Sequence, residues 1–244
     1  MKHLRKMIAI ETKLFFREPA GWVIALLLPT VVLIVLGVIP SLRAPQEAFG
    51  GQRFIDIFLP SLMVITLATL GVNTLPLRLT TLREKGVLRR LSTTPANPAL
   101  LLAAQLVIHL GMAVAAVALL IAVGHLVFDV PLPRNLPGFL LAFGLGLGSV
   151  MALGALIAAA APNNRAASAV AMPLYFAVMF LGGAYLPRFF LPGFLVEIGK
   201  YAPPGVQPLL DAWMGASPAP LQLAVLALIT VLAAVTAARS FRWE

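Results

Sequence analysis

A polar island interrupts the apolar sequence at residues 81–95, Thr81-Leu-Arg-Glu-Lys-Gly-Val-Leu-Arg-Arg-Leu-Ser-Thr-Thr-Pro95, and carries five charged side chains. Apolar runs lie on both sides of it, at residues 57–77 and 100–123. Each run contains the roughly 20 predominantly apolar residues that a helix needs to cross a bilayer. The island is therefore expected to connect two transmembrane helices and to lie outside the membrane.

The composition of the whole chain is that of a membrane protein. Of its 244 residues, 60% are hydrophobic and 11% are charged, whereas soluble domains average about 45–50% apolar and about 25% charged residues. We predict one all-α integral membrane domain over residues 1–244, with no room for an attached ATPase domain. The chain has no cysteine, so disulfides and cysteine-based metal sites are excluded.

Six stretches are long and apolar enough to be transmembrane helices. They are residues 21–39, 57–77, 100–123, 136–161, 167–186 and 221–238. An even number of spans places both termini on the same side. Prolines and glycines inside these stretches are compatible with lipid, where neighbouring helices satisfy the freed backbone groups.

The distribution of Lys and Arg predicts the orientation in the membrane. Thirteen of these residues fall in residues 1–20, 78–98, 162–166 and 239–244, and five fall in the opposite set of connections. This asymmetry predicts a multi-pass protein of the cytoplasmic membrane with both termini and the polar island in the cytosol. The basic excess is thus a topology signal with attraction to anionic lipid, and it does not indicate a nucleic-acid partner.

Residues 1–18 predict an amphipathic helix that lies in the cytosolic membrane interface and turns at Pro19 into the first span, so that residues 1–20 form one interfacial segment. Glu11 and Glu18 fall on its apolar side. One interpretation is that they form ion pairs with a neighbouring basic loop. The other is that these carboxylates snorkel to water.

The polar island has its own pattern. Thr81-x-x-Glu84 matches a capping box and predicts the start of a helix, which Pro95 and Pro98 would end. A solvated basic loop that only obeys the positive-inside rule is the alternative. Such a loop needs the charges but not the interleaved apolar residues Leu82, Val87, Leu88 and Leu91, so we favour a short cytosolic helix.

Residues 187–220 are apolar but too short to cross the membrane. They predict two short helices, at 189–198 and 206–213, broken by Pro203-Pro204-Gly205. Such segments are re-entrant or lie flat at the outer surface. In the fourth span, Gly144, Gly148 and Ala152 form a small-residue face that favours close helix contact, inside the chain or between two copies.

The island resembles a known family. Arg83-Glu-Lys-Gly-Val-Leu-Arg-Arg-Leu-Ser-Thr-Thr-Pro95 is similar to the cytosolic loop between the second and third helices of ABC-2-type transporter permeases, the membrane subunits of drug, polysaccharide and lipid exporters. The likeness extends to Arg17-Glu-Pro19 before a span that contains Pro29. It continues from Gly182-Gly-Ala-Tyr-Leu-Pro187 to Leu209-Leu-Asp211. Pro203-Pro204 departs from the single proline and following aromatic residue that such permeases often have.

The resemblance implies a half-transporter. Two permease copies, or one copy and a paralogue, would pair, and each would bind a separate cytosolic ABC ATPase that carries ATP and Mg²⁺, so that this chain holds no cofactor or metal and is not itself an enzyme. By the same resemblance, the ATPase-coupling helix at residues 81–95 would dock through Arg83, Glu84, Lys85, Gly86, Leu88 and Arg89. The substrate class implied is an amphipathic or lipid-linked molecule that is exported.

An ATP-independent carrier or channel is the alternative function. Ion-driven carriers need ionisable residues inside the membrane, but the six predicted spans contain no Asp, Glu, Lys or Arg. This favours an external energy source. His109 is either a hydrogen-bonded packing residue or a proton relay. Candidates for a substrate path, which could equally be packing or lipid-facing residues, are Asn73, His109, Met172, Phe176, Met179 and Phe180.

Overall fold

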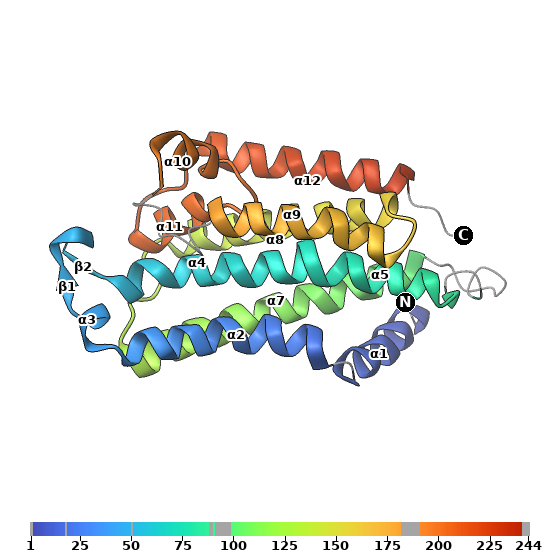
Figure 1. Ribbon diagram of the computed structural model, residues 1–244, viewed down its shortest axis with the longest axis horizontal. Coiled ribbons are helices and arrows are strands. Elements are labelled where there is room, and N and C mark those ends of the chain that lie inside the picture. The colour runs from blue at the N-terminus through green and yellow to red at the C-terminus, as the bar shows by residue number, and fades with distance from the viewer. Residues whose placement is uncertain are drawn as a thin grey trace.

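The computed structural model describes residues 2–17, 19–49, 51–87, 90, 99–181 and 191–240. In these residues the chain is a bundle of long helices that run along one direction (Figure 1). One end of the bundle carries α1 (Lys2–Arg17) and the C-terminal ends of α5 (Leu75–Glu84) and α12 (Pro220–Ser240), and we name it the basic end (Figure 1). The opposite end carries a small β-hairpin with α10 (Gly193–Gly199) and α11 (Val206–Met214), and we name it the hairpin end (Figure 1).

The described residues contain five helices that are long and apolar enough to span a membrane. They are Phe54–Glu84, Leu100–Phe128, Leu136–Ala160, Asn164–Leu181 and Pro220–Ser240. A sixth span results if α1 (Lys2–Arg17) and α2 (Pro19–Val38) are counted together. Their axes are bent by 60° relative to each other, close to the predicted turn at Pro19. The structure thus has an all-helical architecture with five or six candidate spans.

The second span is the centre of the bundle. It consists of α4 (Phe54–Ala68), a π-helix (Thr69–Thr74) and α5 (Leu75–Glu84), which follow one another without a break. Most of its side chains are buried, and the helices that pack against it are α2, α7 (Ala99–Phe128), α8 (Leu136–Ala160), α9 (Asn164–Leu181) and α11. Pro76 has no N–H and its ring would clash with the carbonyl of Val72 in a regular α-helix. The wider turns of the π-helix directly before Pro76 take up this mismatch.

The central helix and α8 (Leu136–Ala160) approach each other at two glycines. A Cβ atom added to Gly154 would lie 1.9 Å from the backbone oxygen of Gly71, and one added to Gly71 would lie 2.6 Å from Val150 Cγ2. Of the predicted small-residue face on α8, Gly148 lies against Thr230 of α12, whereas a Cβ on Gly144 would meet nothing within 4 Å. The closest helix contact therefore uses Gly154, which the sequence pattern did not single out.

The remaining spans are α7 (Ala99–Phe128), α9 (Asn164–Leu181) and α12 (Pro220–Ser240). Helix α9 begins earlier than the predicted residue 167, because the Asn163 side chain accepts a hydrogen bond from the Ala166 N–H at 2.8 Å and caps the helix. The predicted end of this span at residue 186 lies outside the described residues. Helix α12 packs along α8, and α1 packs against α7.

Short elements form the hairpin end. Between α2 and α4 lie α3 (Pro40–Arg43), strand β1 (Pro45–Gln46), a 3-10 helix (Glu47–Phe49) and strand β2 (Gln52–Arg53). The two strands pair in antiparallel register, Pro45 with Arg53 and Gln46 with Gln52, and this hairpin was not predicted. Two short helices are present, α10 (Gly193–Gly199) and α11 (Val206–Met214). Helix α10 begins after its N-cap Pro192, later than the predicted residue 189, and residues 189 and 190 lie outside the described part.

Candidate functional site

A buried ion pair joins α1 to the central helix at the basic end. Glu11 Oε2 lies 3.6 Å from Arg78 Nη2, and the Glu11 residue is only 4% exposed. Glu11 Oε2 also accepts a hydrogen bond from Gln105 Nε2 on α7 at 2.6 Å. The carboxylate thus connects three helices, and of the two interpretations of Glu11 the structure shows the ion pair. Glu18 lies outside the described residues.

The six predicted spans contain no charged side chain, but the central helix is longer than predicted. It continues past residue 77 to Glu84 and so brings Arg78 inside the bundle. The sequence reasoning did not predict that Arg78 and Gln105 contact Glu11. The sequence did contain a signal for such a contact. Glu11 lies on the apolar side of an amphipathic helix, where a buried carboxylate needs a polar partner.

His109 extends this cluster along α7. Its side chain is fully buried, its Nδ1 lies 2.8 Å from the Gln105 carbonyl oxygen, and its ring contacts Phe15 of α1 edge-on at 5.5 Å. A carbonyl oxygen can only accept, so Nδ1 carries the proton and donates. These contacts make His109 part of the packing between α1 and α7.

The C-terminal end of α5 is tied to the turn between α8 and α9. Arg83 Nη1 donates to the Ala161 carbonyl oxygen at 2.7 Å, and Glu84 Oε1 accepts from the Asn164 N–H at 2.8 Å. Thr81 Oγ1 accepts from Asn164 Nδ2 at 2.9 Å. Glu84 lies next to the N-terminus of α9, where a negative charge is stabilised by the helix dipole. Together with the Glu11 pair, these contacts form what we name the basic-end junction.

The capping-box prediction is wrong. Thr81 and Glu84 do not start a helix but lie in the last turn of α5, and Thr81 Oγ1 donates back to the Leu77 carbonyl oxygen at 2.7 Å. Nothing between Pro76 and Gly86 breaks the helix, so it runs out of the bundle into the polar island. At roughly 1.5 Å per residue, the 31 residues of Phe54–Glu84 exceed the roughly 30 Å hydrocarbon core.

The change of direction occurs at Gly86 instead. Its φ of +66° is in the left-handed region, and its N–H donates to the Arg83 carbonyl oxygen at 2.9 Å. This geometry ends a helix and favours glycine. Val87 and Arg90 are helical again, and the Arg90 N–H bonds to the Gly86 carbonyl oxygen at 3.0 Å. Leu88, Arg89 and residues 91–98 lie outside the described part.

Replacing Gly86 with alanine is expected to cost about 1 kcal/mol of stability, because a Cβ strains the left-handed backbone. A Cβ at this position would meet nothing within 4 Å, so the effect is purely conformational. Gly86→Asn is the matched control, since asparagine tolerates this region. Thermal unfolding of the purified chain measures both. If both variants lose the same stability, the left-handed backbone conformation at residue 86 does not explain the effect.

The residues predicted for ATPase docking fall into two groups. Arg83 and Glu84 contact the chain's own α8–α9 turn, as described above. The second group is Lys85, the exposed C-cap of α5, and Gly86, which forms the turn described above. Leu88 and Arg89 lie outside the described residues. Docking through these residues stays a prediction.

The predicted substrate-path residues are not gathered in one place. Met172, Phe176 and Phe180 are exposed on α9, whereas Met179 on the same helix is 6% exposed. Asn73 is half-buried in the π-helix, which packs against α9. His109 belongs to the α1–α7 contact instead. The exposed α9 residues stay candidates for a substrate path. His109 does not lie beside them.

The contacts at the basic end link several helices to one another. No group of three or more His, Asp or Glu side chains that could hold a metal ion occurs in the described residues. The contacts instead link α1, α5, α7 and α9 to the segment that leaves the bundle at Gly86. A displacement of that segment would be passed directly to a helix that runs through the centre of the bundle.

Comparisons with known proteins agree with this architecture. The family model described as ABC-2 type transporter matches residues 2–204. A search of curated proteins and a search of solved structures each gave no match. The matched region covers most of the chain, from α1 to the break before α11, and includes the whole basic-end junction. The chain therefore belongs to the ABC-2 type transporter family, as the multi-pass membrane domain of a transport subunit.

Proposed function

We propose that this chain is the permease subunit of an ATP-driven exporter that moves an amphipathic or lipid-linked substrate across the cytoplasmic membrane. In this proposal both termini are cytosolic, two permease chains pair, and a separate ABC ATPase docks on the segment from Lys85 to residue 95. The observation that carries the proposal is the continuous helix Phe54–Glu84, which passes through the bundle centre and ends at that segment. Membership of the ABC-2 family supports the ATPase as the source of energy.

The contacts at the basic end explain how ATP-driven movement would reach the membrane. A push on the segment after Gly86 acts on α5, which is fixed to α9 through Glu84 and Asn164 and to α1 through Arg78 and Glu11. These helices would move together as a rigid body. Such movements switch packed interfaces between discrete arrangements, here the inward-open and outward-open states.

Substrate is expected to meet the exposed side of α9. Met172, Phe176 and Phe180 recur at four-residue spacing and share one helix face. In a pair of permease chains, this face would line a path for a hydrophobic molecule. Methionine and phenylalanine side chains provide an adaptable apolar surface for such a substrate.

Docking and coupling should be separable by mutation. Lys85→Glu is expected to weaken binding of the ATPase about tenfold, because Lys85 is exposed and its charge is available to a partner. Glu84 bonds to the chain's own Asn164, so we assign it to coupling and not to docking. Glu84→Gln should therefore leave ATPase binding unchanged but lower ATP-driven transport, because it weakens the bond to α9. Co-purification and transport in reconstituted vesicles measure the two effects.

The control for docking is Arg239→Glu, which reverses an exposed charge at the C-terminal end of α12. It should retain ATPase binding. If Arg239→Glu and Lys85→Glu weaken binding equally, the ATPase responds to overall charge and docking at the island is refuted. If Glu84→Gln transports normally, the coupling role of the junction is refuted.

One observation favours the alternative of an ATP-independent carrier. The cluster of Glu11, Arg78 and His109 contains ionisable groups inside the bundle, as ion-coupled carriers require. Vesicles that contain the chain but no ATPase distinguish the two functions. Transport driven by a proton gradient and abolished by Glu11→Gln would establish the carrier. Transport that requires both ATP and the ATPase would establish the exporter.

A further inference from the structure

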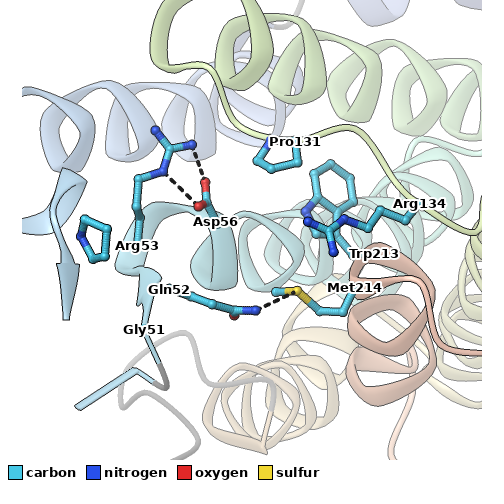
Figure 2. A pocket seen from close by; sticks show the side chains of 9 residues that line it. Gly51, Gln52, Arg53, Asp56, Pro131, Arg134, Trp213 and Met214 are labelled. Carbon is cyan, nitrogen blue, oxygen red and sulfur yellow. Dashed lines mark hydrogen bonds and ion pairs between the residues drawn. The ribbon is translucent and has the colours of Figure 1, made fainter. Parts of the chain in front are cut away.

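A cavity of about 290 Å³ lies at the hairpin end, away from the basic-end junction (Figure 2). Its walls come from three separate connections: the β-hairpin, the segment between α7 and α8, and the end of α11. The polar residues that line it are Gln52, Arg53, Asp56, Arg134 and Trp213. The volume is at the lower limit for ligand pockets, about 300 Å³, and suits a small polar group.

Arg53 and Asp56 neutralise each other on one side of the cavity. Arg53 Nε and Nη2 donate to the two carboxylate oxygens of Asp56 at 2.8 and 2.7 Å. The same guanidinium donates to the carbonyl oxygens of Phe128 at 3.0 Å and Asp129 at 2.7 Å. Arg53 thereby attaches the hairpin to the end of α7. Each carboxylate oxygen of Asp56 accepts one of these bonds, so the Arg53–Asp56 pair contributes no net charge to the cavity.

Contacts within the chain also fix the residues on the opposite side of the cavity. The Arg134 N–H donates to the Trp213 carbonyl oxygen at 3.3 Å, and the Asn135 N–H donates to that of Ala212 at 3.1 Å. These bonds fix the segment before α8 against α11. The Trp213 indole packs edge-on against Phe139 with ring centroids 5.8 Å apart. The position of the indole is therefore set without a ligand.

Three donors around the cavity, two on this side and one on the hairpin, lack a strong acceptor. Trp213 is 3% exposed, and its buried Nε1 has no hydrogen-bond partner in the described residues. The Arg134 side chain is exposed and extends toward the indole in Figure 2, and it forms no ion pair with any residue that the structure describes. Among the described residues, the hydrogen-bond acceptor of Gln52 Nε2 is the sulfur of Met214, at 3.5 Å, and a thioether is a weak acceptor. A buried N–H without an acceptor is costly, which indicates that an acceptor binds here.

We propose that this cavity binds a phosphate group, held by Arg134, Trp213 and Gln52. A guanidinium matches the oxygens of a phosphate with two parallel N–H donors, and the indole and amide N–H groups supply donors from other directions. With Asp56 neutralised by Arg53, the charge of Arg134 remains for the anion. The group is either the headgroup of a membrane lipid or free phosphate, since both present the same oxygens.

Isothermal titration of the full chain in maltoside detergent, which contains no phosphate, tests this site. The probes are inorganic phosphate and a short-chain phosphatidic acid. At least one should bind saturably, and Arg134→Gln should weaken that binding tenfold or more, as expected for loss of a charged donor. Trp213→Phe keeps the ring and removes only the N–H, so it should weaken binding severalfold.

Lys200→Gln is the matched control, because it removes another positive charge at the hairpin end, outside the cavity. It should bind like the unchanged chain, and thermal unfolding should be the same for Lys200→Gln and Arg134→Gln. Binding of phosphatidic acid alone would identify a lipid headgroup, and binding of both probes would identify free phosphate as sufficient. The proposal is overturned if neither probe binds or if Lys200→Gln weakens binding as much as Arg134→Gln.

Discussion

Gly154→Ala is expected to destabilise the chain by about 3 kcal/mol, the upper part of the usual range for overpacked sites, and to abolish transport. The added methyl group would lie 1.9 Å from the Gly71 carbonyl oxygen. That oxygen belongs to the backbone of the central helix, so no side-chain rotation can relieve the clash. Helix α8 and the central helix must separate, and the packing on both sides of the contact is lost.

Gly144→Ala on the same helix is the matched control, because a Cβ there would meet nothing within 4 Å. It should leave stability unchanged or raise it, by up to about 1 kcal/mol, since alanine favours helix more than glycine does. Unfolding in mixed micelles of rising SDS content measures both variants, and reconstituted vesicles measure transport. If Gly154→Ala and Gly144→Ala are equally stable, α8 and the central helix do not approach each other as closely as described.

Glu11→Leu is expected to cost about 3 kcal/mol, in line with the loss of one partner from a buried ion pair. The Arg78 side chain, 10% exposed, would remain in the bundle without the carboxylate, and Gln105 Nε2 would lose its acceptor. ATP-driven transport should fall with stability, because α1 is no longer held to α5. The same SDS unfolding and vesicle assays measure these effects.

Two further variants isolate the ion pair. Lys13→Leu removes an exposed charge from the same helix and should change stability by less than about 0.5 kcal/mol. The double variant Glu11→Leu with Arg78→Leu should be more stable than the sum of the two single losses predicts, because it leaves no buried charge. Strict additivity would mean that Glu11 and Arg78 do not interact.

The helices themselves were predictable from the sequence for a local reason. In lipid a chain must satisfy its backbone hydrogen bonds within each segment, so a run of apolar residues long enough to cross becomes a helix regardless of its neighbours. The spans at 136–161 and 221–238 accordingly match α8 and α12 to within two residues. The break at Pro203-Pro204-Gly205, between α10 and α11, follows equally from local backbone restrictions.

The end of the second span was not predictable in this way. Thr81 and Glu84 fit the start of a helix as well as its last turn. The capping-box pattern covers four residues and is the same whether or not a helix precedes them. Their actual partner is Asn164, which is far along the sequence. Tertiary contact with the α8–α9 turn, and the positive φ of Gly86, decided where the helix ends.

The sequence by itself determined the membrane class, the presence of the long apolar helices and the family, since these depend on composition, local periodicity and a short motif. Only the tertiary structure decided which polar side chains meet. It joined Glu11 to Arg78 and Gln105, it chose Gly154 instead of Gly144 for the close contact, and it assembled the cavity at the hairpin end from three connections. Each of these depends on how separate helices pack side by side, and no local pattern in the chain carries that information.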